Sequence, residues 1–86
     1  MPVSESQSFK NITSTTTVYT GTGGLTGIFV ASASATPTIK IQDGAATLVN
    51  TFIPVGATFY PMPGRFNTSL VITISGTVDM TVFWSI

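Results

Sequence analysis

The side chains that could carry out acid–base, nucleophilic or metal chemistry are few in this 86-residue chain. The sequence contains no histidine and no cysteine, and its only acidic residues are Glu5, Asp43 and Asp79. General acid–base catalysis, nucleophile activation and metal binding need several such groups close together, whereas these three carboxylates are spread along the chain. We therefore predict that the protein is not an enzyme and binds no metal or cofactor. Asp43 is interpreted as the first residue of an Asp-Gly turn.

A glycine cluster has part of the spacing of a phosphate-binding loop. Its members are Gly21, Gly23, Gly24 and Gly27. In the G-x-G-x-x-G motif the third glycine would fall at position 26, which is Thr26, and no helical pattern follows to supply an N-terminus for the phosphate. Glycines also permit the positive φ of tight turns, so we interpret the cluster as a turn between strands.

Charged residues make up only 7% of the chain, and the net charge is zero. The basic residues Lys10, Lys40 and Arg65 are scattered, which is not the clustered pattern that binds a nucleic-acid backbone. The longest apolar stretch, near residues 27–33, is too short to cross a bilayer, and the N-terminus lacks the pattern of a secretory signal. We therefore expect a protein that is synthesised in a cytoplasm and binds neither nucleic acid nor membrane.

The elements that position these side chains are predicted to be β-strands. Residues 70–84 show this most clearly, because apolar and polar residues alternate on both sides of the pair Gly76-Thr77. This pattern is typical of a β-hairpin with one buried face and a hydroxyl-rich outer face. The alternating apolar residues are Leu70, Ile72, Ile74, Val78, Met80, Val82 and Trp84. Trp84 is predicted to lie in the core rather than to form a platform for ligand stacking.

The same period predicts further short strands upstream, separated by glycine and proline breaks. They lie near residues 15–19, 25–33, 38–42, 47–53 and 58–60. With six or seven short strands and no helical period, we predict an all-β fold in which residues 14–86 form a single small β-sandwich, jelly-roll-like or immunoglobulin-like, with a small barrel as the alternative.

Residues 1–13 are mostly polar and have no sustained period, so we predict an extended N-terminal arm on which Phe9 and Ile12 are the only anchors. The domain is small, has few charges and has no disulfide to stabilise it, which favours assembly into a homo-oligomer or docking on a partner. A monomer whose surface is hydrated by its sixteen threonines is the alternative.

A second cluster surrounds the proline-rich segment 61–64. It contains residue types that are enriched at protein interfaces, namely Phe59, Tyr60, Met62, Arg65 and Phe66. These side chains either form a contact surface or plug one end of the sandwich. The predicted partner-binding residues are therefore Tyr60, Met62, Arg65 and Phe66 of this cluster, together with Phe9 and Ile12 of the arm.

Three segments of the sequence together resemble a known class of proteins. They are Gly24-x-x-Gly27-Ile28-x-Val30, Ile39-x-Ile41-x-Asp43-Gly44 and Leu70-x-Ile72-x-Ile74-Ser75-Gly76-Thr77-x-Asp79-Met80-Thr81-Val82. This pattern, which spans about residues 18–86, is similar to that of short β-sandwich virion proteins of tailed bacteriophages, including capsid decoration (cement) proteins. The resemblance implies a structural protein that binds the major capsid protein on the outer surface of the assembled capsid, as an oligomer, and stabilises the shell.

Some proteins of this kind belong to the phage tail or its fibres. The alternative function is therefore a tail-tip or fibre module that recognises a host surface through the segment 60–66. A free carbohydrate-binding module is a third class, which has little support because asparagine and glutamine are scarce outside the arm.

Overall fold

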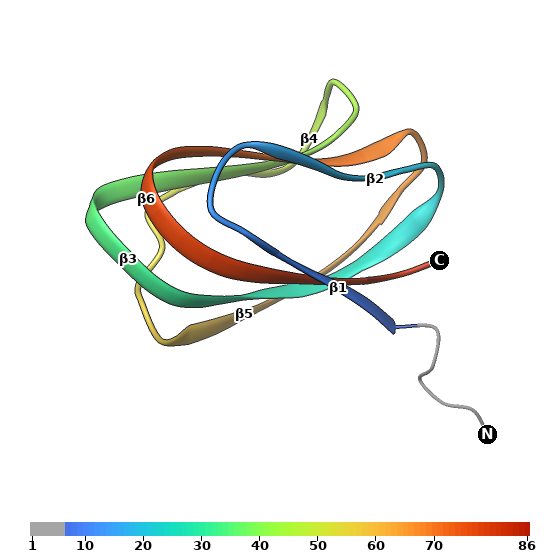
Figure 1. The fold of residues 1–86 in the computed structure, drawn as a ribbon. Helices are drawn as coiled ribbons and strands as arrows, with labels where there is room; N and C mark the ends of the chain where they lie inside the picture. The colour runs from blue at the N-terminus through green and yellow to red at the C-terminus, as the bar shows by residue number, and fades with distance from the viewer. Residues whose placement is uncertain (1–6) are drawn as a thin grey trace.

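The computed structural model describes residues 7–86, and this part of the chain is an all-β fold in which the sheet curls into a small sandwich (Figure 1). In chain order the strands are β1 (Gln7–Ile12), β2 (Thr16–Thr20), β3 (Gly23–Asp43), β4 (Ala46–Phe52), β5 (Thr58–Phe66) and β6 (Ser69–Ser85). The long strands β3 and β6 pair with each other in antiparallel fashion along most of their length. The predicted fold class is confirmed.

The sheet is folded in half at one line that crosses both long strands. The ladder between β3 and β6 shifts register at three places, and its longest gap lies between Ser34 and Thr38, opposite the bend in β6. Residues with positive φ mark the bend on three segments that cross it: Thr36 (φ 48°), Ala57 (φ 57°) and Gly76 (φ 92°). This conformation, which is costly for residues with a Cβ, reverses the curvature of the strands and brings the two halves face to face.

Folding produces two four-stranded layers that share β3 and β6. The first layer has the order β5-β3-β6-β1 and contains residues 24–34 and 77–85 of the long strands. The second layer has the order β4-β3-β6-β2 and contains residues 38–43 and 70–75. The resulting body is flat, with extents of 41 × 29 × 17 Å.

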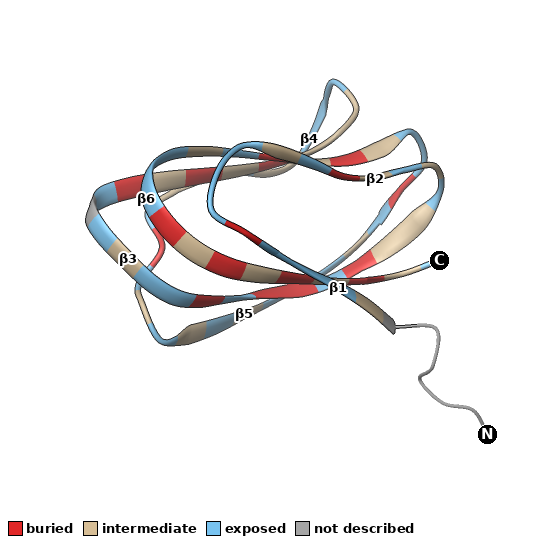
Figure 2. Cartoon of the chain, in the orientation of Figure 1, coloured by how far each residue is buried: buried red, intermediate tan, exposed pale blue. Residues whose placement is uncertain are grey.

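The core lies between the layers, and burial alternates along the strands (Figure 2). Its fully buried large side chains are Phe66, Ile28, Ile39, Ile41, Leu70, Ile72, Met80, Val30, Val78 and Val82. Trp84 is 7% exposed, which confirms its predicted core position. Its ring lies 6.2 Å from that of Tyr19, and its indole Nε1–H has no hydrogen-bond partner among the described residues.

Two predicted boundaries are wrong because strands continue where breaks were expected. Residues 70–84 do not form a hairpin: β6 runs through Gly76, and each half of it pairs with a different half of β3. Likewise, the predicted break at residues 34–37 is a bend inside β3 rather than an end. In both cases a residue that permits positive φ bends the strand, and a shared partner strand keeps it extended.

Two other segments that were predicted to be irregular belong to the sheet. Residues 7–12 of the predicted arm form β1 and pair with residues 80–85 of β6, while residues 1–6 lie outside the described residues. The proline segment 61–64 lies within β5, which pairs with β3 alone among the described strands. Proline lacks a backbone N–H but fits an edge strand, where one side needs no partner.

Candidate functional site

Four of the predicted partner-binding residues point into the molecule. Ile12 is 4% exposed and Phe66 is fully buried, so both are core residues rather than contact residues. Tyr60 and Met62 are half-buried and pack against the core. The Tyr60 hydroxyl oxygen accepts a hydrogen bond from the backbone N–H of Val55 at 2.9 Å, which fixes the ring at the end of the sandwich. Alternation along β5 explains this arrangement, because it turns every second side chain inward.

The other two predicted residues, Phe9 and Arg65, are exposed on the outer face of the first layer. Phe9 on β1 is 73% exposed and stands opposite Phe83 of β6. Two strands away, Phe29 of β3 stands opposite Phe59 of β5, and these side chains are 39% and 47% exposed. We call these four residues the phenylalanine face, since they cross all four strands of the layer.

Gly27 allows the phenylalanine face to be continuous. It lies on β3 opposite both Phe83 of β6 and Pro61 of β5, so it occupies the centre of the face. Without a side chain there, the Phe59 ring lies over the β3 backbone, and its centroid is 6.3 Å from that of Phe83 in an edge-to-face arrangement. Such pairs contribute about 0.5–1.5 kcal/mol beyond their area burial.

The outer face of the second layer has a different character. Its outward positions on β2, β3 and β6 carry Thr17, Lys40, Gln42 and Thr73, as shown by their pairing in register. The predicted hydroxyl-rich outer face is therefore correct for this layer, and on the first layer the hydroxyls of Thr81 and Ser85 share the outer face with the phenylalanines. Scattered apolar residues are normal on a protein surface, but four phenylalanines on the outer face of the first layer, with none on the outer face of the second, make the first layer a candidate interaction surface.

Sequence reasoning missed Phe29 and Phe83 because each lies between two core residues. Phe29 separates Ile28 from Val30, and Phe83 separates Val82 from Trp84. Three successive apolar residues, as at 28–30 and 82–84, are equally typical of a strand that is buried on both faces. Such a run nevertheless makes both faces of the strand apolar. One face packs in the core, and the other must pack against a further layer or a partner, which could have indicated a contact surface.

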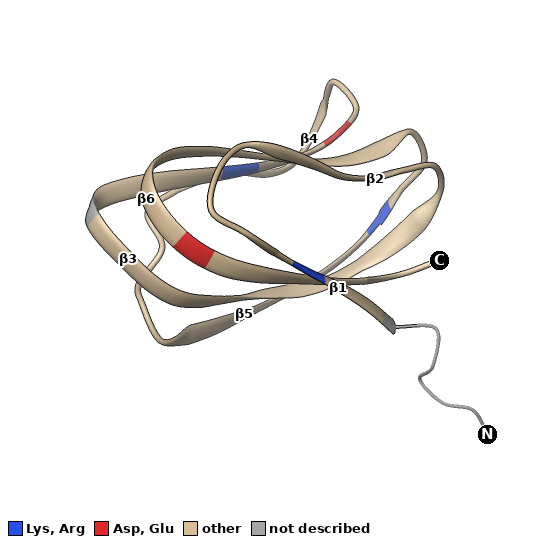
Figure 3. Cartoon of the chain, in the orientation of Figure 1, with Lys and Arg blue, Asp and Glu red and all other residues tan. Residues whose placement is uncertain are grey.

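One acidic and one basic residue flank the phenylalanine face, within a chain whose charged side chains are few and well separated (Figure 3). Asp79 of β6 lies toward the bend, and its Oδ1 accepts a hydrogen bond from Asn11 Nδ2 at 2.8 Å. Arg65 lies at the other end, where β5 pairs with Gly24 of β3. No ion pair is formed by either residue within the described part of the chain.

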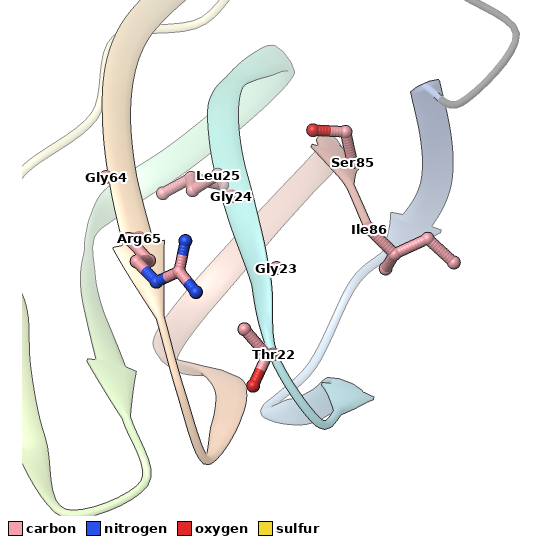
Figure 4. Close-up of a pocket in the computed structure, with 8 residues that line it drawn as sticks. All are labelled: Thr22, Gly23, Gly24, Leu25, Gly64, Arg65, Ser85 and Ile86. Atoms are coloured by element: carbon pink, nitrogen blue, oxygen red, sulfur yellow. The ribbon is translucent and has the colours of Figure 1, made fainter.

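Arg65 borders a shallow hollow of about 490 Å³ at the open end of the sandwich. The hollow is lined by Thr22, Gly23, Gly24, Leu25, Gly64, Arg65, Ser85 and Ile86. Figure 4 shows the guanidinium reaching from β5 toward the glycines of β3. Gly24 leaves the backbone of β3 uncovered there, since a Cβ at this position would meet only the Ser85 hydroxyl, and the hollow is open to solvent.

The Asp43 carboxylate connects two turns through hydrogen bonds. Its Oδ1 accepts hydrogen bonds from the backbone N–H groups of Thr68 (2.8 Å) and Ser69 (3.3 Å), and its Oδ2 accepts one from Asn67 (3.0 Å). The bonds from Asn67 and Thr68 are the main reason that the pKa of this carboxyl is below its usual value. Asp43 therefore joins the β3–β4 turn to the β5–β6 turn and has a structural role.

No group of acidic residues with the arrangement of a metal site occurs within residues 7–86. The same part of the chain contains no helix that could span a membrane. Comparison with protein-family models, with curated proteins and with solved structures finds no match.

Proposed function

We propose that this protein is a non-enzymatic structural protein of a tailed-phage virion, which binds the major capsid protein on the outer surface of the assembled head and stabilises the shell. The phenylalanine face is the observation that carries this proposal. Exposing aromatic side chains to water on an outer face is unfavourable. Covering them with another protein surface stabilises the complex by about 25 cal/mol per Å² of apolar area buried. A regular shell supplies such surfaces at fixed spacing.

The way the protein engages its neighbours differs from the expectation based on an arm. Phe9 was expected to anchor a free segment on a neighbouring subunit, but it belongs to β1 and contributes to the phenylalanine face instead. A contact surface built on a folded layer loses little conformational entropy on binding, whereas a free arm must become ordered at that step. This favours attachment as a rigid body.

The alternative, a tail or fibre module that recognises a host surface, loses the feature that supported it. That function was assigned to a loop at residues 60–66, and these residues lie in strand β5. Three of its supposed contact residues, Tyr60, Met62 and Phe66, face the inside of the sandwich.

The test mixes purified protein with phage heads that lack it and measures bound copies by cryo-electron microscopy. Regular density on the head lattice is expected for the wild type, and Phe59→Ser should reduce the occupancy strongly. Val55→Ser is the matched control, because Val55 is 63% exposed but lies in the β4–β5 connection, away from the face. Empty lattice sites with the wild type would overturn the proposal, and density confined to the tail would favour the alternative.

A further inference from the structure

We infer that the phenylalanine face is a homodimer interface, in which two copies pack face to face and Asp79 of each copy pairs with Arg65 of the other. This inference rests on the proposed function, because it concerns the same surface: a second copy of the chain covers the phenylalanine face in solution, and the capsid protein replaces that copy on the head. It makes a statement about the protein in solution, in the absence of any capsid.

The positions of the two charges carry the argument. Asp79 stands opposite Ser32 near the bend, whereas Arg65 stands opposite Gly24, which pairs with Ser85 at the far end of β6. Six residues along β6 and two strand spacings separate the two positions, which makes them about 22 Å apart. They are thus at diagonal corners of the first layer, too far apart to pair within one copy.

The phenylalanines lie between these corners. In the register of the layer, Phe9 and Phe83 form one row and Phe29 and Phe59 form the next row toward the bend. The centre of the four rings therefore falls close to the midpoint of the diagonal between the two charges. An apolar centre with polar groups at the rim is the usual composition of a stable protein interface.

A two-fold axis through that midpoint, lying in the plane of the face and perpendicular to the diagonal, exchanges the two corners. Each Asp79 then meets the Arg65 of the other copy, and the two sets of phenylalanines meet at the centre. Such an interface is isologous, as in most homodimers. A face bearing one acid and one base at equal distances from its centre is complementary to itself.

Both charged side chains have groups free to form such a pair. Asp79 uses Oδ1 for its bond with Asn11, and Oδ2 has no partner within residues 7–86. Arg65 uses Nε for a bond to Asn67 Oδ1 at 3.2 Å, which leaves the two terminal nitrogens of the guanidinium available. The shallow hollow beside Arg65 gives an incoming carboxylate room to approach, since Gly24, which stands opposite Arg65, carries no side chain.

The face is also large enough for a standard protein–protein interface. The widest face of a body with extents of 41 × 29 Å covers at most about 1,200 Å², and a standard interface buries about 800 Å² per partner. The opposite layer presents threonine, lysine and glutamine outward and offers no comparable apolar centre. The first layer is therefore the side on which two copies meet.

The experiment exchanges charges between copies and follows the association state by sedimentation velocity. Asp79→Lys alone and Arg65→Asp alone should each weaken the dimer at least about tenfold, because both symmetric contacts change from attraction to repulsion. An equimolar mixture of the two variants should form a heterodimer, since each repulsive contact is then replaced by an attractive one. Circular dichroism confirms that each variant is folded.

Lys40→Asp provides the matched control, because it changes the net charge by the same amount as Arg65→Asp but lies on the outer face of the second layer. A labelled Asp79→Lys chain should move to the dimer mass when Arg65→Asp is added and should form clearly less mixed dimer when Lys40→Asp is added, because that pairing keeps one repulsive contact. A monomeric wild type would overturn the inference. So would a dimer that resists both single changes, which would indicate pairing through the β1 edge, or a mixture that fails to associate.

The two proposals can fail separately. Heads are absent from the sedimentation experiment, so a dimer that does not bind heads would refute the capsid function and leave the interface intact. Conversely, a monomer that decorates heads would refute the interface alone.

Discussion

Replacing Gly27 with alanine tests the packing that builds the phenylalanine face. A Cβ at this position would lie 2.6 Å from the carbonyl oxygen of Tyr60, 3.2 Å from the Cα of Pro61 and 2.9 Å from Cζ of Phe59. The first two atoms belong to the backbone of β5, so rotating a side chain cannot relieve the contact. The strand β5 must move away from β3, which weakens their pairing and displaces the Phe59 ring.

The expected cost follows from two opposing effects. Inserting a methyl group into a tightly packed site costs about 1–3 kcal/mol, and two backbone contacts at once place this site toward the upper end. Removing a glycine from a strand returns about 0.5–1 kcal/mol, because glycine loses the most conformational freedom on folding. Gly27→Ala should therefore lower the free energy of unfolding by about 2 kcal/mol, or about 8–16 °C in Tm for a domain of this size.

Gly24→Ala is the matched control in the same strand. A Cβ there would meet only the Ser85 hydroxyl, at 3.8 Å, which is an ordinary contact. It should leave stability unchanged or raise it by about 0.5–1 kcal/mol. Urea unfolding followed by the fluorescence of Trp84 compares both variants at one protein concentration, since association adds to apparent stability. Equal unfolding midpoints for the two variants would refute the reasoning.

The remaining predictions concern the core tryptophan and the turn carboxylate. Trp84→Ala should destabilise the protein by about 3–5 kcal/mol in urea unfolding. Trp84→Phe should cost clearly less, because it retains a ring against Tyr19 and removes an indole N–H that has no acceptor. Equal losses of stability in the two variants would contradict this prediction. For Asp43 the folded pKa is lowered, so its stabilisation is complete above the unfolded value of about 3.9 and is lost as the pH falls through the lower folded value. Asp43→Asn should be less stable than the wild type at pH 7, and the difference should shrink on acidification; parallel pH profiles would argue against the three hydrogen bonds.

Sequence periodicity alone identified most of the core in β6. Leu70, Ile72, Val78, Met80 and Val82 are all buried as the alternation predicted. This succeeds because the side-chain direction in a strand depends only on local backbone geometry, which reverses at every residue. The same alternation placed Trp84 in the core, and the pair Asp43-Gly44 assigned Asp43 to a turn.

The pairing partners of each segment were decided by tertiary structure. Gly76 adopts positive φ, which both a hairpin turn and a bend within a strand require, so the residue type cannot distinguish the two. The choice depends on β3, which pairs with both halves of β6 and holds the strand open. Likewise, the prolines of residues 61–64 fit a loop or an edge strand equally well, and only the position of β5 at the edge decides between them.

The phenylalanine face also depends partly on the sequence and partly on the tertiary structure. In the sequence, Phe29 and Phe83 lie out of phase with the core residues beside them, so the strands carrying them are apolar on both sides. Whether the second side is covered depends on how many layers the chain can build. Residues 7–86 build two layers, which enclose one core, and no further layer of these residues covers the outer face of the first. Burial is a property of what packs against a side chain, so only the tertiary structure could locate the phenylalanine face.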